Sequence, residues 1–164
     1  MEGKLPKARK YILIVAPHTS NWDFLVGLGA RVVLNFDPKY VGKKELFRWP
    51  FGGLFKALGG YPVERTKQTN FVQAVADIFE KEDDFILTIT PEGTRSRVDN
   101  WKTGFYYIAE KSNVPILPVA FDYSTKTVVL GELKTTDQDV DTMISDLKQW
   151  YRQFPGKHPQ KGVV

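Results

Sequence analysis

The chain has 164 residues, a length that suits one domain with a single hydrophobic core. It has no cysteine and only two histidines, His18 and His158, which excludes disulfides and thiolate metal sites and argues against any metal site built on several histidines. Its net charge of +4 favours an anionic partner such as a phosphate ester, an anionic lipid surface or nucleic acid, although a mildly basic solvated surface is the commoner explanation.

The chain shows no membrane-spanning or secretory signal. No apolar stretch approaches the roughly 20 residues that cross a bilayer. The first ten residues, Met1–Lys10, lack the apolar core of a signal peptide. We therefore expect a cytoplasmic protein, with peripheral contact to the inner face of the membrane as the alternative.

Apolar strand-like runs alternate with helix-like segments along the chain. In chain order we expect a strand over Lys10–Ala16, a helix over Ser20–Leu34, a strand over Lys39–Val41, a helix over Pro50–Leu58, a strand over Gly60–Val63, a helix over Asn70–Glu82, a strand over Phe85–Thr90, a helix over Trp101–Lys111, strands over Pro115–Phe121 and Thr127–Leu130, and a helix over Val140–Gln153. Several strands are apolar almost throughout, which is typical of strands covered on both faces. The pattern predicts an α/β fold, a single layered domain with a mostly parallel central sheet flanked by helices.

The last residues differ in composition from the rest. Residues 155–164 are polar and rich in turn-forming types. We expect the domain to span residues 1–154, with 155–164 as a polar C-terminal tail outside the core.

His18 and Asp23 form the first candidate site. His18 directly follows an apolar strand, and Asp23 lies five residues later, near the start of the next helix. An imidazole titrates near neutral pH, and a carboxylate on its other ring nitrogen fixes the tautomer and stabilises the imidazolium. The alternative is structural: Ser20 followed three residues later by Asp23 resembles a capping box, and one carboxylate can serve both purposes.

A second candidate loop, Pro91–Ser96, follows the strand over Phe85–Thr90. Arg95 can grip a phosphate with two hydrogen bonds, Gly93 allows close backbone approach, and the neighbouring hydroxyls add donors. The ordinary explanation is a polar turn with a surface arginine. If both strands are parallel, this loop and the His18 loop emerge at the same edge of the sheet, where ligands bind in such folds.

Four segments, His18–Asp23, Gly60–Arg65, Pro91–Ser96 and Val114–Val119, come in the order of the four sequence blocks of the glycerolipid acyltransferase family. The chain resembles this family, which includes glycerol-3-phosphate and lysophosphatidic acid acyltransferases, over Tyr11–Asp122. The resemblance implies a glycerol-phosphate acyltransferase-like fold. It also implies an acyltransferase that moves a fatty acyl group from an acyl-CoA or acyl-carrier-protein thioester to a hydroxyl of a glycerol-phosphate or lysophospholipid-like acceptor.

By this resemblance His18 is the general base and Asp23 orients it. The hydroxyl attacks the thioester directly, without a covalent enzyme intermediate and without a metal or cofactor beyond the acyl donor. The residues that match the acceptor-binding blocks are Arg65, Glu92, Gly93, Thr94, Arg95 and Ser96. Lys102 matches the basic residue that follows the third block. Tyr61 and Pro62 depart from the usual second block, which leaves the acceptor's identity open.

The segment Lys43–Lys56 interleaves aromatic and basic residues, a composition that suits the interface of a membrane. Its alternatives are a core helix with a basic outer face and an acyl-chain groove. Two other functions remain open for the chain: an acyl-thioester hydrolase, and a non-catalytic module that binds anionic lipid. Nucleic-acid binding is a poor explanation, because the basic residues are dispersed and no recognition module is legible.

Overall fold

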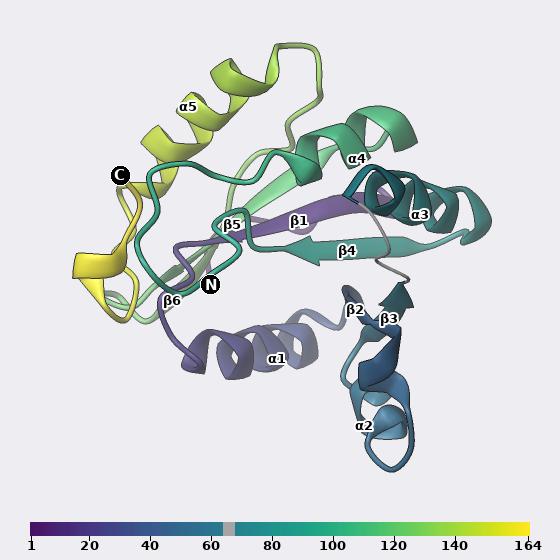
Figure 1. The fold of residues 1–164 in the computed structure, drawn as a ribbon. Helices are drawn as coiled ribbons and strands as arrows, with labels where there is room; N and C mark the ends of the chain where they lie inside the picture. The colour runs from purple at the N-terminus through teal and green to yellow at the C-terminus, as the bar shows by residue number, and fades with distance from the viewer. Residues whose placement is uncertain (64–67) are drawn as a thin grey trace.

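The computed structural model describes residues 1–63 and 68–164. Its centre is a six-stranded sheet in the order β3-β2-β4-β1-β5-β6 (Figure 1). The strands are β1 (Lys10–Ala16), β2 (Pro38–Lys43), β3 (Gly60–Val63), β4 (Phe85–Ile89), β5 (Ile116–Asp122) and β6 (Thr127–Leu130). All neighbours pair in parallel except β6, which is antiparallel to β5. The predicted α/β fold with a mostly parallel sheet is confirmed.

Helices cover both faces of this sheet. They are α1 (Trp22–Leu34), α2 (Gly52–Ala57), α3 (Gln68–Lys81), α4 (Gly104–Ser112) and α5 (Val140–Tyr151), with short 3-10 helices η1 (Lys44–Phe47) and η2 (Pro159–Lys161). Figure 1 shows α3, α4 and α5 on one face and α1 on the other. Within the described residues, no helix is long and apolar enough to cross a bilayer.

Strand β1 shows why its sequence is apolar throughout. Ile12, Ile14 and Ala16 belong to the core cluster that includes residues of α3, α4 and α5. Leu13 and Val15 point the opposite way, into a second cluster that packs against α1. Successive side chains of a strand alternate between faces, so a strand covered on both sides needs apolar residues at every position.

Four predicted helix starts are displaced. The helices expected from Pro50 and Asn70 begin at Gly52 and Gln68, and the other two have a visible structural cause. The helix expected from Trp101 begins at Gly104, because Trp101 instead packs its ring edge-on against Tyr151, with 5.6 Å between ring centroids. The helix expected from Ser20 begins at Trp22. In both cases residues just before the helix make tertiary contacts or cap the turn, and their composition alone does not separate these roles.

The expectation that residues 155–164 lie outside the core is wrong at two points. Gly156 is buried, and Val163 packs against the larger core cluster. The Pro155 carbonyl also accepts a hydrogen bond from the Tyr123 N–H at 3.1 Å. Turn-rich composition describes local backbone preference, whereas these contacts depend on which loop lies nearby.

Candidate functional site

The site lies where two loops leave the sheet side by side. Strands β1 and β4 are parallel neighbours, so the loops that follow them emerge at the same edge, as predicted. The His18 N–H donates a hydrogen bond to Glu92 Oε2 at 2.8 Å, which ties the two loops together.

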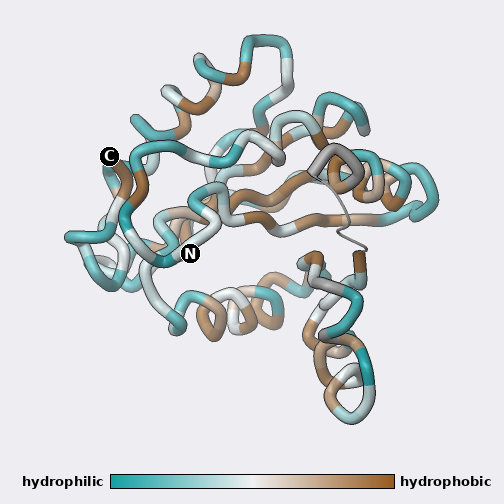
Figure 2. Tube along the Cα trace, viewed as in Figure 1, coloured by the Kyte–Doolittle hydropathy of each residue, from teal (hydrophilic) through white to brown (hydrophobic). Residues whose placement is uncertain are grey.

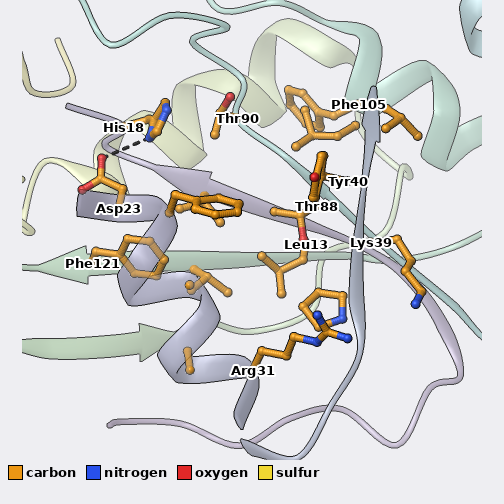
Figure 3. A pocket seen from close by; sticks show the side chains of 18 of the residues that line it. Leu13, His18, Asp23, Arg31, Lys39, Tyr40, Thr88, Thr90, Phe105 and Phe121 are labelled. Carbon is orange, nitrogen blue, oxygen red and sulfur yellow. Dashed lines mark hydrogen bonds and ion pairs between the residues drawn. The ribbon is translucent and has the colours of Figure 1, made fainter. Parts of the chain in front are cut away.

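His18 and Asp23 meet as expected. His18 Nδ1 lies 3.0 Å from Asp23 Oδ2, and the Asp23 side chain is almost fully buried (Figure 3). A carboxylate on Nδ1 favours the tautomer with its proton there, which leaves Nε2 as the ring nitrogen able to accept a proton. The histidine ring also lines a cavity, so a substrate can reach it.

Asp23 also holds the turn that precedes α1. Its Oδ2 accepts hydrogen bonds from the Thr19 and Ser20 N–H groups, both at 2.9 Å. The Ser20 hydroxyl accepts one from the Trp22 N–H at 3.2 Å. One carboxylate therefore anchors the turn and faces His18, while the N-cap position of α1 falls on Asn21, without a side-chain cap bond, rather than on Ser20.

Electrostatics keep Asp23 ionised. Burial raises its pKa, but hydrogen bonds from His18, Tyr123 and the backbone outweigh this effect and hold the pKa below its ordinary value. The carboxylate is therefore charged at neutral pH and able to stabilise a protonated imidazole.

Tyr123 is a site residue that the sequence analysis missed. Its hydroxyl donates to Asp23 Oδ1 at 2.7 Å. Tyr123 directly follows β5, the other parallel neighbour of β1. Its place directly after a strand that ends at the same sheet edge was the feature of the sequence that could have identified it.

Glu92 was predicted to bind the acceptor, and the structure places its side chain against the backbone of the His18 loop. It is buried beneath the His18 loop and does not line either cavity described below. Burial raises the pKa of Glu92 to about 7, against the lowering effect of its hydrogen bond from His18. Its contacts make it a support for the His18 backbone.

Three of the predicted acceptor-binding residues, Gly93, Thr94 and Arg95, line a cavity with His18. A small cavity of about 300 Å³ is lined by His18, Thr90, Gly93, Thr94 and Arg95. Gly93 has a φ of +65°, and a Cβ there would lie 2.8 Å from Cε of Lys102, so a glycine lets the lysine stem cross the loop.

Ser96 and Arg65 are not brought to this cavity by the described structure. Ser96 is exposed, and its N–H donates to the Thr94 hydroxyl at 3.3 Å. Arg65 lies outside the described residues. No three histidine or acidic side chains gather into a metal-binding group in the described parts of the chain.

A much larger cavity, of about 1280 Å³, begins at the same histidine. It passes between α1 and the sheet, and Figure 3 shows side chains from His18 and Asp23 at one end to Arg31 at the other. Its lining is mostly apolar, with contributions from Leu13, Val15, Phe24, Leu28, Val119 and Phe121. Arg95 and Lys102 also border it, so cations stand near His18.

The aromatic and basic segment divides between two environments. Phe55 lines the large cavity and packs edge-on against Phe47. Trp49, Phe51 and Leu54 are exposed, Trp49 to 93%. Part of the segment therefore lines the large cavity, and part presents apolar side chains at the surface.

Helix α1 also exposes apolar side chains on its outer side. Figure 2 shows hydrophobic stretches along α1 and around α2. The exposed large residues of α1 are Trp22, Phe24, Leu25, Val32 and Val33. This surface was not predicted from the sequence.

Comparison with known proteins adds independent findings. A family model described as Acyltransferase matches residues 2–122. The chain is 29% identical over 127 residues to 1-acyl-sn-glycerol-3-phosphate acyltransferase of Escherichia coli (strain K12), a match that covers 74% of this chain and 51% of that protein. It is 32% identical over 138 residues to the protein of the same name from Saccharomyces cerevisiae (77% and 43%), and 32% identical over 136 residues to the human beta form (75% and 47%). The chain thus spans about half the length of the curated relatives it matches.

Proposed function

Because the chain belongs to the glycerolipid acyltransferase family, we propose that it transfers a fatty acyl group from a thioester to the free hydroxyl of a 1-acylglycerol 3-phosphate. One observation carries the proposal: His18 lines both the small polar cavity and the large apolar one. A base where the two cavities meet can act on an acceptor hydroxyl while the phosphate lies in the polar cavity and an acyl chain lies in the apolar one.

The His18–Asp23 pair performs the proton transfer. Nε2 of His18 takes the proton of the acceptor hydroxyl while the oxygen of that hydroxyl attacks the thioester carbonyl carbon. The new C–O bond forms, the C–S bond breaks, and the departing thiolate takes the proton from the imidazolium. Asp23 stabilises the imidazolium between these steps, and no group on the enzyme becomes acylated.

The small cavity holds the acceptor phosphate. Arg95 supplies a guanidinium that can donate two parallel hydrogen bonds to phosphate oxygens, and Lys102 adds a second cation. The Thr94 hydroxyl adds a further donor. Arg65 adds a further cation by the family pattern, and Ser96 and Glu92 support this loop from outside the cavity.

The large cavity holds an acyl chain. Its lining is mostly apolar, and its volume of about 1280 Å³ is above the range of roughly 300–1,000 Å³ usual for small-molecule sites. Burying methylene groups there is favourable, at about 0.8 kcal/mol for each CH₂. The donor is either acyl-CoA or acyl-carrier protein, and the reaction needs no other cofactor.

The membrane contact is formed by the exposed part of Lys43–Lys56 together with the outer side of α1. Trp49, Phe51 and Leu54 suit insertion among lipids, while Arg48 and Lys56 suit anionic head groups. Since the large cavity runs between α1 and the sheet, lipid chains held by this surface lie close to it. The protein then works at the cytoplasmic face of a membrane.

The test is product analysis with purified protein. The chain is incubated with acyl-CoA or acyl-carrier protein and 1-acylglycerol 3-phosphate, and lipids are identified by mass spectrometry. We expect diacylglycerol 3-phosphate to form. His18→Ala should lower the rate of its formation roughly 100- to 10,000-fold and leave the unfolding midpoint unchanged.

Three other outcomes would oppose this function. Free fatty acid released at the same rate with and without acceptor indicates a thioester hydrolase. Binding to anionic vesicles without consumption of any thioester indicates a lipid-binding module. Near wild-type transfer by His18→Ala contradicts the mechanism.

A further inference from the structure

The carboxylate of Asp23 has two differently bonded oxygens. Oδ2 faces His18 Nδ1 and also accepts the Thr19 and Ser20 N–H groups. Among the described residues, the hydrogen bond given to Oδ1 comes from the Tyr123 hydroxyl at 2.7 Å. With Asp23 almost completely buried, water is a poor substitute for this donor.

Tyr123 lies beyond the part of the chain that the family model matches, which ends at residue 122. Its own position is set by the turn after β5. Asp122 Oδ1 accepts the Ser124 N–H at 2.9 Å and the Ser124 hydroxyl at 2.6 Å, and Tyr123 N–H donates to the Pro155 carbonyl at 3.1 Å.

The segment Pro155–His158, which we name the C-terminal strap, also touches the His18 loop. The His158 N–H donates to the Thr19 hydroxyl at 3.2 Å. Gly156 approaches so closely that a Cβ there would lie 2.7 Å from Thr19 Oγ1. The strap therefore contacts the backbone of Tyr123 and, in the His18 loop, the side chain of Thr19.

We propose that Tyr123 is a positioning residue, held by the C-terminal strap, that keeps Asp23 turned so that Oδ2 faces Nδ1 of His18. Its importance for turnover rests on the proposed function. A carboxylate with one strongly bonded oxygen on each side has a single favoured rotation about its Cβ–Cγ bond. Loss of the Oδ1 partner leaves the carboxylate held through Oδ2 alone, which loosens this rotation and weakens the preference for the Nδ1–H tautomer, the form with a basic Nε2.

The hydroxyl of Tyr123 is suited to this task over the working pH range. Burial and the negative charge of Asp23 raise the pKa of Tyr123 well above its ordinary value. The Tyr123 hydroxyl therefore stays protonated, and a donor, at and around neutral pH.

The test compares two tyrosine hydroxyls. Tyr123→Phe removes the bond to Asp23, while Tyr106→Phe removes a similar bond, to the Gln138 carbonyl at 2.8 Å, away from the site. The ring nitrogens of His18 are observed by ¹⁵N NMR at about pH 8, above the ordinary imidazole pKa of about 6.5. With two histidines in the chain, His18→Ala assigns the signals.

We expect wild type and Tyr106→Phe to hold His18 as the Nδ1–H tautomer, and Tyr123→Phe to show a clear share of the Nε2–H tautomer. In the acyl-transfer assay we expect kcat of Tyr123→Phe to fall roughly 10-fold, with KM for donor and acceptor within about twofold of wild type.

An unchanged tautomer ratio in Tyr123→Phe overturns the proposal, whatever its activity. A tautomer change in a protein that transfers no acyl group supports the positioning role and rejects the proposed function, so the two failures are distinguishable. Should Tyr123→Phe not fold, Gly156→Ala displaces the strap from Thr19, and the same NMR measurement decides.

Discussion

The backbone N–H of His18 donates a hydrogen bond to the carboxylate of Glu92, over 2.8 Å and across 74 positions of sequence. The bond joins the loops that follow the neighbouring parallel strands β1 and β4. Because Glu92 is buried and lines neither cavity, its contact with the protein backbone is its structural role.

This buried carboxyl makes stability depend on pH. Burial raises the pKa of Glu92 from 4.5 to about 7, so the folded state holds a proton that the unfolded state releases. Its stabilising contribution is complete below pH 4.5 and is lost as pH rises to about 7. We expect Glu92→Gln, which keeps an acceptor oxygen, to gain up to about 3 kcal/mol relative to wild type between pH 4.5 and 8. Urea unfolding at both pH values measures this gain, and a constant difference between the proteins contradicts it.

Asp23 and Asp139 both accept backbone N–H groups at the start of a helix, but Asp23 alone of the two faces His18. We expect Asp23→Asn to lower kcat roughly 100- to 10,000-fold, because the imidazolium loses its charged partner. Asp139→Ala should lower the free energy of unfolding by about 1 kcal/mol and leave kcat unchanged. Steady-state kinetics and urea unfolding of both variants test this contrast, and equal kinetic effects would oppose it.

A substitution at Gly93 tests whether the loop Pro91–Ser96 binds the acceptor phosphate. The φ of +65° at Gly93 opposes a Cβ, and a Cβ there would also push aside the end of the Lys102 side chain. We expect Gly93→Ala to cost about 1 kcal/mol of stability and to raise KM for the acceptor more than KM for the donor. Gly53→Ala is the control, since a Cβ at that exposed position meets nothing within 4 Å. An acceptor KM that stays at the wild-type value would separate Gly93 from phosphate binding.

Two glycines of α1 test whether the large cavity holds the acyl chain. Gly27 lines it and faces Phe121, whereas a Cβ on Gly29 meets nothing within 4 Å. We expect Gly27→Leu to narrow the cavity and to lower kcat/KM for long-chain donors about 10-fold more than for short-chain donors. Burying several fewer CH₂ groups, at about 0.8 kcal/mol each, is sufficient for this effect. Gly29→Leu should keep the wild-type chain-length profile, and identical profiles for both variants would place the acyl chain elsewhere.

The exposed aromatic surface predicts membrane binding. We expect Trp49→Glu to weaken binding to anionic phospholipid vesicles about 10-fold or more, because it replaces a side chain that is 93% exposed and suited to the interface with a negative charge. Leu133→Glu, at another exposed apolar position, is the matched control. Vesicle co-sedimentation at several salt concentrations provides the measurement. Equal binding by both variants would remove this surface from the proposal.

Much of the fold was predictable from local pattern. The apolar run of β1 predicted a strand buried on both faces, and the alternation of elements predicted the parallel sheet. The starts of α1 and α4 were displaced because residues next to a helix, such as Trp101, can satisfy tertiary packing and still look helical in composition. The segment 155–164 was misjudged because most of its contacts, at Pro155 and His158, are made by backbone groups that every sequence carries, and a lone Val163 gives no apolar pattern.

The amino-acid sequence by itself determined which functional groups are present: a histidine after a buried strand, a carboxylate five residues later, and a loop with an arginine and a glycine. Residue type, hydrophobic period and short spacing are local properties, and they carry this information. Only the tertiary structure decided that Glu92 supports the His18 backbone, that one histidine borders two cavities, and that Tyr123 bonds to Asp23. These contacts join positions far apart in the chain, so they depend on how strands and helices pack rather than on any local pattern.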